Sequence, residues 1–363
     1  MIKAAYKGGA VMKNRCAIPV CLQPYRRLLV TLAAGLAAVG LFYAARGSTK
    51  AMDWWVWRVS MPVKRGLGAV TDLVPFSVCE LGATVLILLV LGRLAGCIRR
   101  RGGFVRWGLW LACLLVWGYA AVCALWGTQY YAPSIAGQPP EVSVAQLEAV
   151  TDYFARKVNE TACPVSDRQT LLQNTEGLYD PLTARWPRLD GPERRPKPAF
   201  YSKLMSAWGF TGYLCPLTGE STLNVDSPAV FLPVTIAHEY AHQRGVAAEQ
   251  EANFFGILAA LNGGREAQYS AWLLGYLYLS NALYSADPER GAASYRTLCE
   301  TARADLAENN AYWDSWKGPV AETGEKVYTA FLQNYGQSLG MKSYGACVDL
   351  LVQEFLPYTT SGS

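Results

Sequence analysis

Three long apolar runs near the N-terminus constrain the fold of this chain more than any other feature. They cover residues 28–45, 76–98 and 104–128. A helix of about 20 apolar residues is long enough to cross the hydrocarbon core of a bilayer. We therefore predict a mainly α-helical membrane protein in which three transmembrane helices occupy residues 28–128.

Basic residues flank these runs and predict which way they cross. Residues 1–27 form a basic leader, and four arginines bracket the turn between the second and third runs: Arg99, Arg100, Arg101 and Arg106. Short basic loops tend to stay in the cytoplasm. We expect a multi-pass protein of the cell membrane with a cytoplasmic N-terminus and with residues 129–363 outside the cytoplasm. The leader and the first run are longer than a cleavable signal peptide needs, so we expect the first helix to be retained.

The segment 46–75 joins the first two runs and mixes Trp54, Trp55 and Trp57 with basic residues. This mixture suits a segment that lies along the lipid headgroups, or a connecting helix with one polar face. Glu80 and Arg93 lie near the two ends of the second run, and we expect both side chains to reach the headgroup layer.

Composition changes after the third run. Basic residues outnumber acidic ones before residue 128 and acidic residues outnumber basic ones after it, so the net charge of +5 describes a basic membrane region and an acidic globular region. Because the basic residues flank apolar runs, we expect the lipid bilayer as a partner and no nucleic acid. The oligomeric state stays open.

Residues 129–142 contain three prolines and a glycine and predict a linker to a globular domain at 143–357. Ser143 and Gln146 have the spacing of a capping box, which predicts the first helix of that domain. Residues 269–286 form another uncharged run, but its tyrosines and polar residues favour a buried helix over a fourth span. The cysteines of this region allow three disulfide pairings, which stay open: Cys163, Cys215, Cys299 and Cys347.

The only two histidines of the chain lie in the sequence His238-Glu239-Tyr-Ala-His242. One helical turn separates them, so both imidazoles project from one face and can bind one divalent cation, for which Zn²⁺ is the expected metal. Glu239 lies about 100° around the helix, where it can act as a general base on water at the open side of the metal. This is the chemistry of HExxH metallopeptidases.

A third protein ligand is expected from a second helix. Gly245 can turn the chain so that Glu249 or Glu251 returns toward the histidines. Helical phase favours Glu249, because Asn253 follows on the same face and can orient a histidine, whereas Glu251 shares its face with apolar residues. The choice between the two glutamates stays open.

These residues resemble the gluzincin-type metallopeptidases, in which a helix with an ExxxD pattern follows HExxH and supplies the third ligand. Here Glu249 and Asn253 match that pattern, with asparagine in place of aspartate. The resemblance implies a zincin-like α+β domain with a small sheet and one zinc ion per chain.

A closer resemblance covers most of the chain. The sequences Pro75-Phe76-Ser77, Thr211-Gly212-Tyr213 and HExxHQxGxxxExEANF, which begins at His238, are similar to a family of bacterial membrane proteins defined by a domain of unknown function. That resemblance implies a membrane-anchored, metallopeptidase-like domain and names no substrate.

A peptidase also needs a strand that binds the substrate backbone and a donor for the developing oxyanion. We expect the strand at Thr222, Leu223, Asn224 and Val225, and the donor at Tyr213 or Tyr276. The sequence thus predicts a membrane-anchored zinc metallopeptidase that hydrolyses peptide or protein substrates. The alternative is a non-catalytic zinc-binding membrane module for sensing or protein interaction.

Overall fold

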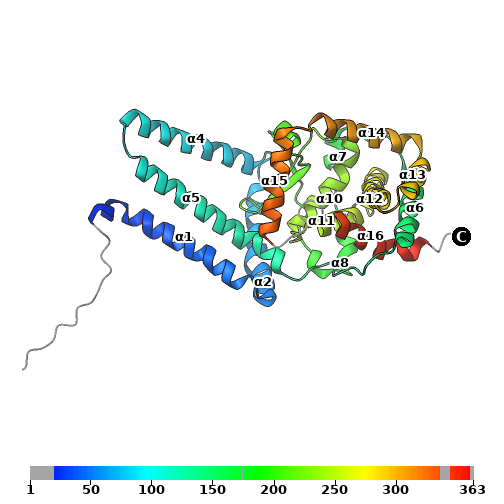
Figure 1. The fold of residues 1–363 in the computed structure, drawn as a ribbon, viewed down its shortest axis with the longest axis horizontal. Coiled ribbons are helices and arrows are strands. Elements are labelled where there is room, and N and C mark those ends of the chain that lie inside the picture. The colour runs from blue at the N-terminus through cyan, green and yellow to red at the C-terminus, as the bar shows by residue number, and fades with distance from the viewer. Residues whose placement is uncertain (1–19, 174, 336–343, 360–363) are drawn as a thin grey trace, which may run out of the picture.

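The structure, a computed structural model, describes residues 20–173, 175–335 and 344–359 and is mainly helical (Figure 1). Three helices are long and apolar enough to cross a membrane: α1 (Arg26–Ala45), α4 (Val78–Arg100) and α5 (Phe104–Leu125). All three project from the same side of a globular part, and the turn between α4 and α5 lies at their far end (Figure 1). The prediction of three long apolar helices is confirmed.

The segment between α1 and α4 is helical throughout most of its length. It comprises α2 (Thr49–Trp55), a π-helical turn (Val56–Ser60) and α3 (Met61–Thr71). One face is buried and includes Met52, Val56 and Met61, whereas Trp54 is exposed on the other. The segment is therefore a connecting helix with one face packed against protein.

The core of the globular part is built from five helices: α6 (Val144–Thr161), α10 (Leu232–Gln243), α11 (Glu249–Ala260), α12 (Arg265–Ala286) and α16 (Tyr344–Thr359). The capping box at Ser143 and Gln146 begins α6, as predicted. The uncharged run 269–286 belongs to α12, whose side chains at Tyr269, Leu273 and Tyr276 are fully buried. It is a core helix, because these side chains are enclosed by protein.

Shorter elements complete the chain. They are η1 (Val20–Tyr25), η3 (Gly127–Tyr131), α7 (Arg168–Gln173), α8 (Asp180–Thr183), η4 (Pro187–Leu189), α9 (Ser202–Ala207), η5 (Ala229–Phe231), α13 (Pro288–Arg296), α14 (Glu300–Ser315) and α15 (Pro319–Asn334). Helix α15 stands where the long apolar helices meet the globular part (Figure 1). The last residue of α15 is bonded to these helices, because Asn334 Nδ2 donates to the Tyr119 hydroxyl at 3.0 Å and Asn334 Oδ1 accepts from the Tyr43 hydroxyl at 3.1 Å.

A small sheet has the strand order β1-β3-β2. Strand β1 (Lys197–Pro198) runs parallel to β3 (Glu220–Leu223), and β2 (Gly212–Cys215) runs antiparallel to it with Tyr213 opposite Thr222. Strand β3 is therefore the central strand, and β2 lies at one edge.

The sheet is fixed to the start of α4 by buried charges. The Glu220 carboxylate accepts hydrogen bonds from the Cys79 backbone N–H and, at 2.7 Å, from Lys197 Nζ. Lys197 also donates to the Thr71 carbonyl at 2.6 Å. Burying such charges costs free energy unless all are paired, so these contacts hold the sheet and α4 in one geometry.

The globular part includes residues before the predicted boundary at 143. Gln129 in the predicted linker is buried and accepts a hydrogen bond from Lys64 Nζ at 3.1 Å. In the described residues, Cys163, Cys215, Cys299 and Cys347 are all free thiols.

Candidate metal centre

Two consecutive helices carry the HExxH sequence and the glutamates that follow it. Pro233 lies in the first turn of α10, where its missing N–H removes no helical hydrogen bond. The helix ends just before Gly245, whose φ of 96° is in the left-handed region that favours glycine. The Val246 N–H then donates to the Ala241 carbonyl at 3.1 Å, which closes the end of the helix. As predicted, Gly245 turns the chain back toward the histidines.

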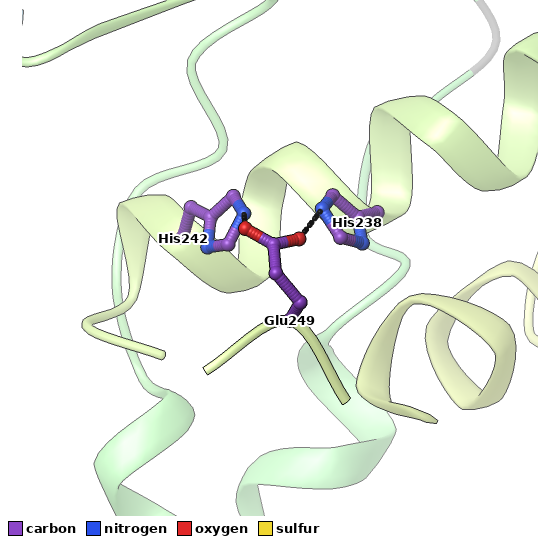
Figure 2. Close-up of side chains that lie close together, drawn as sticks. All are labelled: His238, His242 and Glu249. Atoms are coloured by element: carbon purple, nitrogen blue, oxygen red, sulfur yellow. Dashed lines mark ion pairs between the residues drawn. The ribbon is translucent and has the colours of Figure 1, made fainter. Parts of the chain in front are cut away.

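The structure brings His238, His242 and Glu249 together. One ligand atom of each lies within 4.8 Å of the others. His238 Nε2 is 3.3 Å from Glu249 Oε2, and His242 Nε2 is 3.7 Å from Glu249 Oε1. Figure 2 shows the carboxylate directed between the two imidazoles. These three groups therefore face one point in space.

Gly256 permits this arrangement. A Cβ atom at this position of α11 would lie 2.9 Å from both the backbone N and the Cα of His238. Backbone atoms cannot move aside as a flexible side chain can, so α10 and α11 approach this closely only with glycine at the crossing. The close approach brings Glu249, two turns earlier in α11, within reach of the histidines.

His242 is oriented for metal binding by a backbone hydrogen bond. Its Nδ1 lies 2.6 Å from the Val246 carbonyl oxygen, which can only accept, so Nδ1 carries the proton and Nε2 keeps its lone pair toward Glu249. Burial lowers the pKa of His242 to about 4. The edge of the ring also meets the indole of Trp126, with 5.3 Å between the ring centroids.

Glu249 is ionised in this setting. Burial alone would raise its pKa, but the adjacent His242 and His238 outweigh burial and hold the pKa at about 2. Burial opposes protonation of His238. The hydrogen bond to Glu249 and the negative charge of Glu249 outweigh burial and raise the pKa of His238 above its ordinary value. The Tyr328 hydroxyl of α15 donates to Glu249 Oε1 at 2.5 Å.

The two other predicted residues of α11 lie in different environments. Asn253 is buried with its side chain beside the His238 ring. Glu251 points to another face of the helix, where it accepts hydrogen bonds from Ser134 and, at 3.4 Å, from the Ala136 N–H. Among the candidate third ligands, the structure places Glu249 beside the histidines and Glu251 away from them.

Glu239 lies against the sheet. Its side chain is only 1% exposed, and its Oε2 has no hydrogen-bond partner in the described residues. A Cβ atom on Gly212 would collide with the carboxylate, so β2 passes directly over Glu239. Burial raises the pKa of Glu239 to about 8. A carboxylate in this environment can exchange a proton near neutral pH.

In the structure, the candidate substrate strand is β2 and not the expected residues 222–225. In the central strand β3, Thr222 and Leu223 have partners on both sides, and the Asn224 and Val225 N–H groups donate to the Thr211 carbonyl and the Ser202 hydroxyl. None of these backbone positions is open to a further strand. In the described residues only β2 combines an open edge with contact to Glu239.

The predicted oxyanion donors lie elsewhere. Tyr213 lies on the opposite face of β2 from Gly212, beside Thr222 and Cys79, and Tyr276 lies inside α12 facing Ser280 and Ser294. Side chains alternate along a strand, which turns Tyr213 away from the histidines.

Sequence reasoning missed Tyr328, the tyrosine bonded to Glu249. Its only sequence signal is the spacing of Tyr328, Phe331 and Tyr335 on one face of a helix, which also fits ordinary packing.

Two imidazole nitrogens and one carboxylate form the ligand set of many catalytic zinc sites, with a fourth position left for water or substrate. The neutral, oriented His242 and the ionised Glu249 fit that set. The Val246 carbonyl supplies the outer contact that such a ligand needs for His242, whereas Asn253 lies beside His238, whose Nδ1 has no hydrogen-bond partner in the described residues.

Comparison with known proteins gives one match. A family model described as "Protein of unknown function (DUF3810)" matches residues 59–352, which cover well over half of the chain. No curated protein and no solved structure matches the chain. The matched region includes α3, α4, α5 and the whole histidine and glutamate cluster.

Proposed function

We propose that this chain, which belongs to the DUF3810 family, is a membrane-anchored zinc metallopeptidase. The observation that carries the proposal is the convergence of His238, His242 and Glu249 on one point, next to the buried Glu239. In this proposal the three residues bind one Zn²⁺ per chain. We also propose a zincin-like arrangement of helix and sheet, supported by β2 passing over Glu239.

A zinc ion held there would polarise a water molecule and a substrate carbonyl. Glu239 takes the proton from the attacking water and delivers it to the leaving amine. The Val246 carbonyl holds the His242 imidazole in position, and Asn253 lies beside the His238 ring. The open edge of β2 pairs with the extended substrate backbone, which brings a peptide bond past Glu239.

We further propose that the three apolar helices span the cell membrane and that the site lies outside the cytoplasm. The arginines at the turn between α4 and α5 support this orientation, because that turn lies at the end of the helices remote from the globular part (Figure 1).

Metal analysis of the full chain purified in detergent tests the function. We expect one zinc per chain, and we expect a chelator to remove both the zinc and the cleavage of a mixed peptide library measured by mass spectrometry. Protein that is folded but does not bind zinc contradicts the proposal. Zinc binding without any cleavage supports the non-catalytic zinc module instead.

Tyr328 is the best-placed group to stabilise the oxyanion, because its hydroxyl lies beside a proposed zinc ligand. We expect Tyr328→Phe to keep zinc and to lower kcat about 100-fold with little change in KM, the size seen when one such donor is removed. Tyr335→Phe is the matched control, since that hydroxyl contacts Cys123 instead. A Tyr328→Phe variant with the activity of the wild type removes Tyr328 from the mechanism.

A further inference from the structure

We propose that the substrate of this site is the juxtamembrane segment of a membrane-anchored polypeptide, cleaved close to the bilayer surface. The inference rests on the proposed peptidase function and membrane orientation. Two contacts between the globular part and the apolar helices support this inference. One places the metal centre at the end of α5, and the other places an apolar surface beside the first turns of α4.

The metal centre lies at the end of a proposed transmembrane helix. Trp126 directly follows α5, which ends at Leu125. Its indole meets the His242 ring with 5.3 Å between centroids, and Lys64 Nζ lies 4.9 Å from the centre of the same indole. Both side chains are buried, so these contacts fix the metal centre against the end of α5. A domain on a long stalk would place its site far from the lipid. Here the side chain of Trp126 alone lies between the last residue of α5 and the His242 ring.

The second contact involves an apolar surface around α9, which we call the lipid-facing patch. Its four large side chains are 62%, 46%, 57% and 39% exposed, in the order Phe200, Tyr201, Leu204 and Trp208. Exposed large apolar side chains that gather on one short helix and its flanks are candidates for an interaction site.

The position of this patch identifies the bilayer as its occupant. The Tyr201 hydroxyl lies 2.9 Å from Thr84 Oγ1 in α4, and the Phe200 ring lies 6.3 Å from the Phe76 ring. Thr84 is six residues inside α4, which corresponds to a depth of about 9 Å along the helix. Interfacial segments bury their apolar faces by about 5–10 Å, so the Tyr201 end of the patch lies at the depth of the outer leaflet.

Glu80 fixes this geometry. We expected its side chain to reach the headgroups, but it is buried and accepts hydrogen bonds from the Phe200 N–H at 2.6 Å and the Tyr201 N–H at 3.3 Å. Hydrogen bonds to a charged group are stronger than those between neutral groups. The patch is therefore held against α4 and does not swing freely.

The chain connects the patch directly to the proposed substrate strand. Trp208 is followed four residues later by Gly212, the first residue of β2 and the one that lies over Glu239. Four residues span at most about 13 Å when extended, and here a turn at Gly209 makes the separation shorter. A polypeptide that leaves the bilayer beside the patch therefore reaches the open edge of β2 within a few residues.

Reconstituted vesicles test this proposal. The full chain is placed in phosphatidylcholine and phosphatidylglycerol vesicles with a probe, a single Leu/Ala transmembrane helix carrying a randomised 12-residue extracytoplasmic segment. The control probe has a 40-residue Gly/Ser spacer between helix and segment, so both probes are equally concentrated at the membrane. We expect the short-tether probe to be cleaved at least tenfold faster, with cuts within about ten residues of the helix. Equal cleavage of both probes overturns the inference and leaves the peptidase function intact, whereas no cleavage of either probe contradicts the function itself.

Substitutions in the lipid-facing patch distinguish contact of the patch with the bilayer from catalysis at the metal centre. We expect Leu204→Glu to remove most of the preference for the short tether while cleavage of the free 12-residue peptide stays at the wild-type rate. Tyr295→Glu is the control, because Tyr295 is comparably exposed, at 44%, on the distant helix α13 (Figure 1).

Lipid contact can also be measured without activity, with a fluorescent noncanonical amino acid placed at position 204 or at position 295. Brominated lipids should quench it at position 204 only. Absence of quenching at position 204 overturns the assignment of the patch to the bilayer.

Discussion

Glu239→Gln is expected to abolish nearly all peptide cleavage while leaving one zinc bound per chain. The amide keeps the size of the side chain but cannot take a proton from water, and general-base catalysis contributes about a hundredfold to ten-thousandfold. Zinc should stay bound, because Glu239 lies against β2 and the converging ligand atoms belong to His238, His242 and Glu249. Cleavage of the peptide library and metal content of the same preparation check both halves of the prediction.

The result is informative only if the variant is folded. Circular dichroism and the melting temperature should match the wild type, since the amide has the size of the buried carboxyl group and Oε2 of that group has no partner in the described residues. Comparing the membrane proteomes of cells with wild-type protein and with Glu239→Gln would then reveal natural substrates. Full activity in this folded, zinc-bound variant would exclude Glu239 as the general base.

Much of the candidate site could be predicted because its signals are local in sequence. His238, His242, Gly245 and Glu249 lie within one helix, its end and the start of the next. Helical periodicity determines which of their side chains share a face. Gly245, with a φ of 96°, lets the chain reverse direction after the first helix. The same holds for the three apolar helices and for the capping box of α6, whose patterns depend on neighbouring residues alone.

The rest of the site depends on contacts between residues far apart in sequence. Tyr328 reaches Glu249 across 79 positions, and Trp126, which directly follows α5, meets His242 of α10. No local pattern encodes either contact. The sequence also does not show which strand lies at the edge of the sheet. Strand β1 has only two residues, and its pairing with β3 makes β3 the central strand.

Long-range contacts also join the segment 46–75 and the predicted linker 129–142 to the globular domain. Met61 approaches Gly245 so closely that a Cβ there would lie 3.0 Å from the Met61 sulfur. Gln129 accepts from the buried Lys64. The membrane-proximal helices thus form one wall of the metal centre, and a soluble fragment starting at residue 143 would lack that wall.

The second large effect concerns the third ligand. Glu249→Ala is expected to lower zinc affinity by more than about 100-fold, beyond the effect of losing an outer contact of a ligand. The substitution removes the negative charge between the two imidazoles and the acceptor for Tyr328. Competition with a chelator of known affinity measures the loss, and cleavage should fall with metal content.

Glu251→Ala provides the matched control, because the two glutamates lie in the first turn of the same helix. Glu251 binds Ser134 and the Ala136 N–H, so its loss should lower the melting temperature slightly and leave zinc affinity within about threefold of the wild type. Loss of zinc from Glu251→Ala with retention in Glu249→Ala would reverse the assignment. Equal retention in both would mean that the two histidines bind the metal without either glutamate, which neither the charge nor the geometry of the cluster favours.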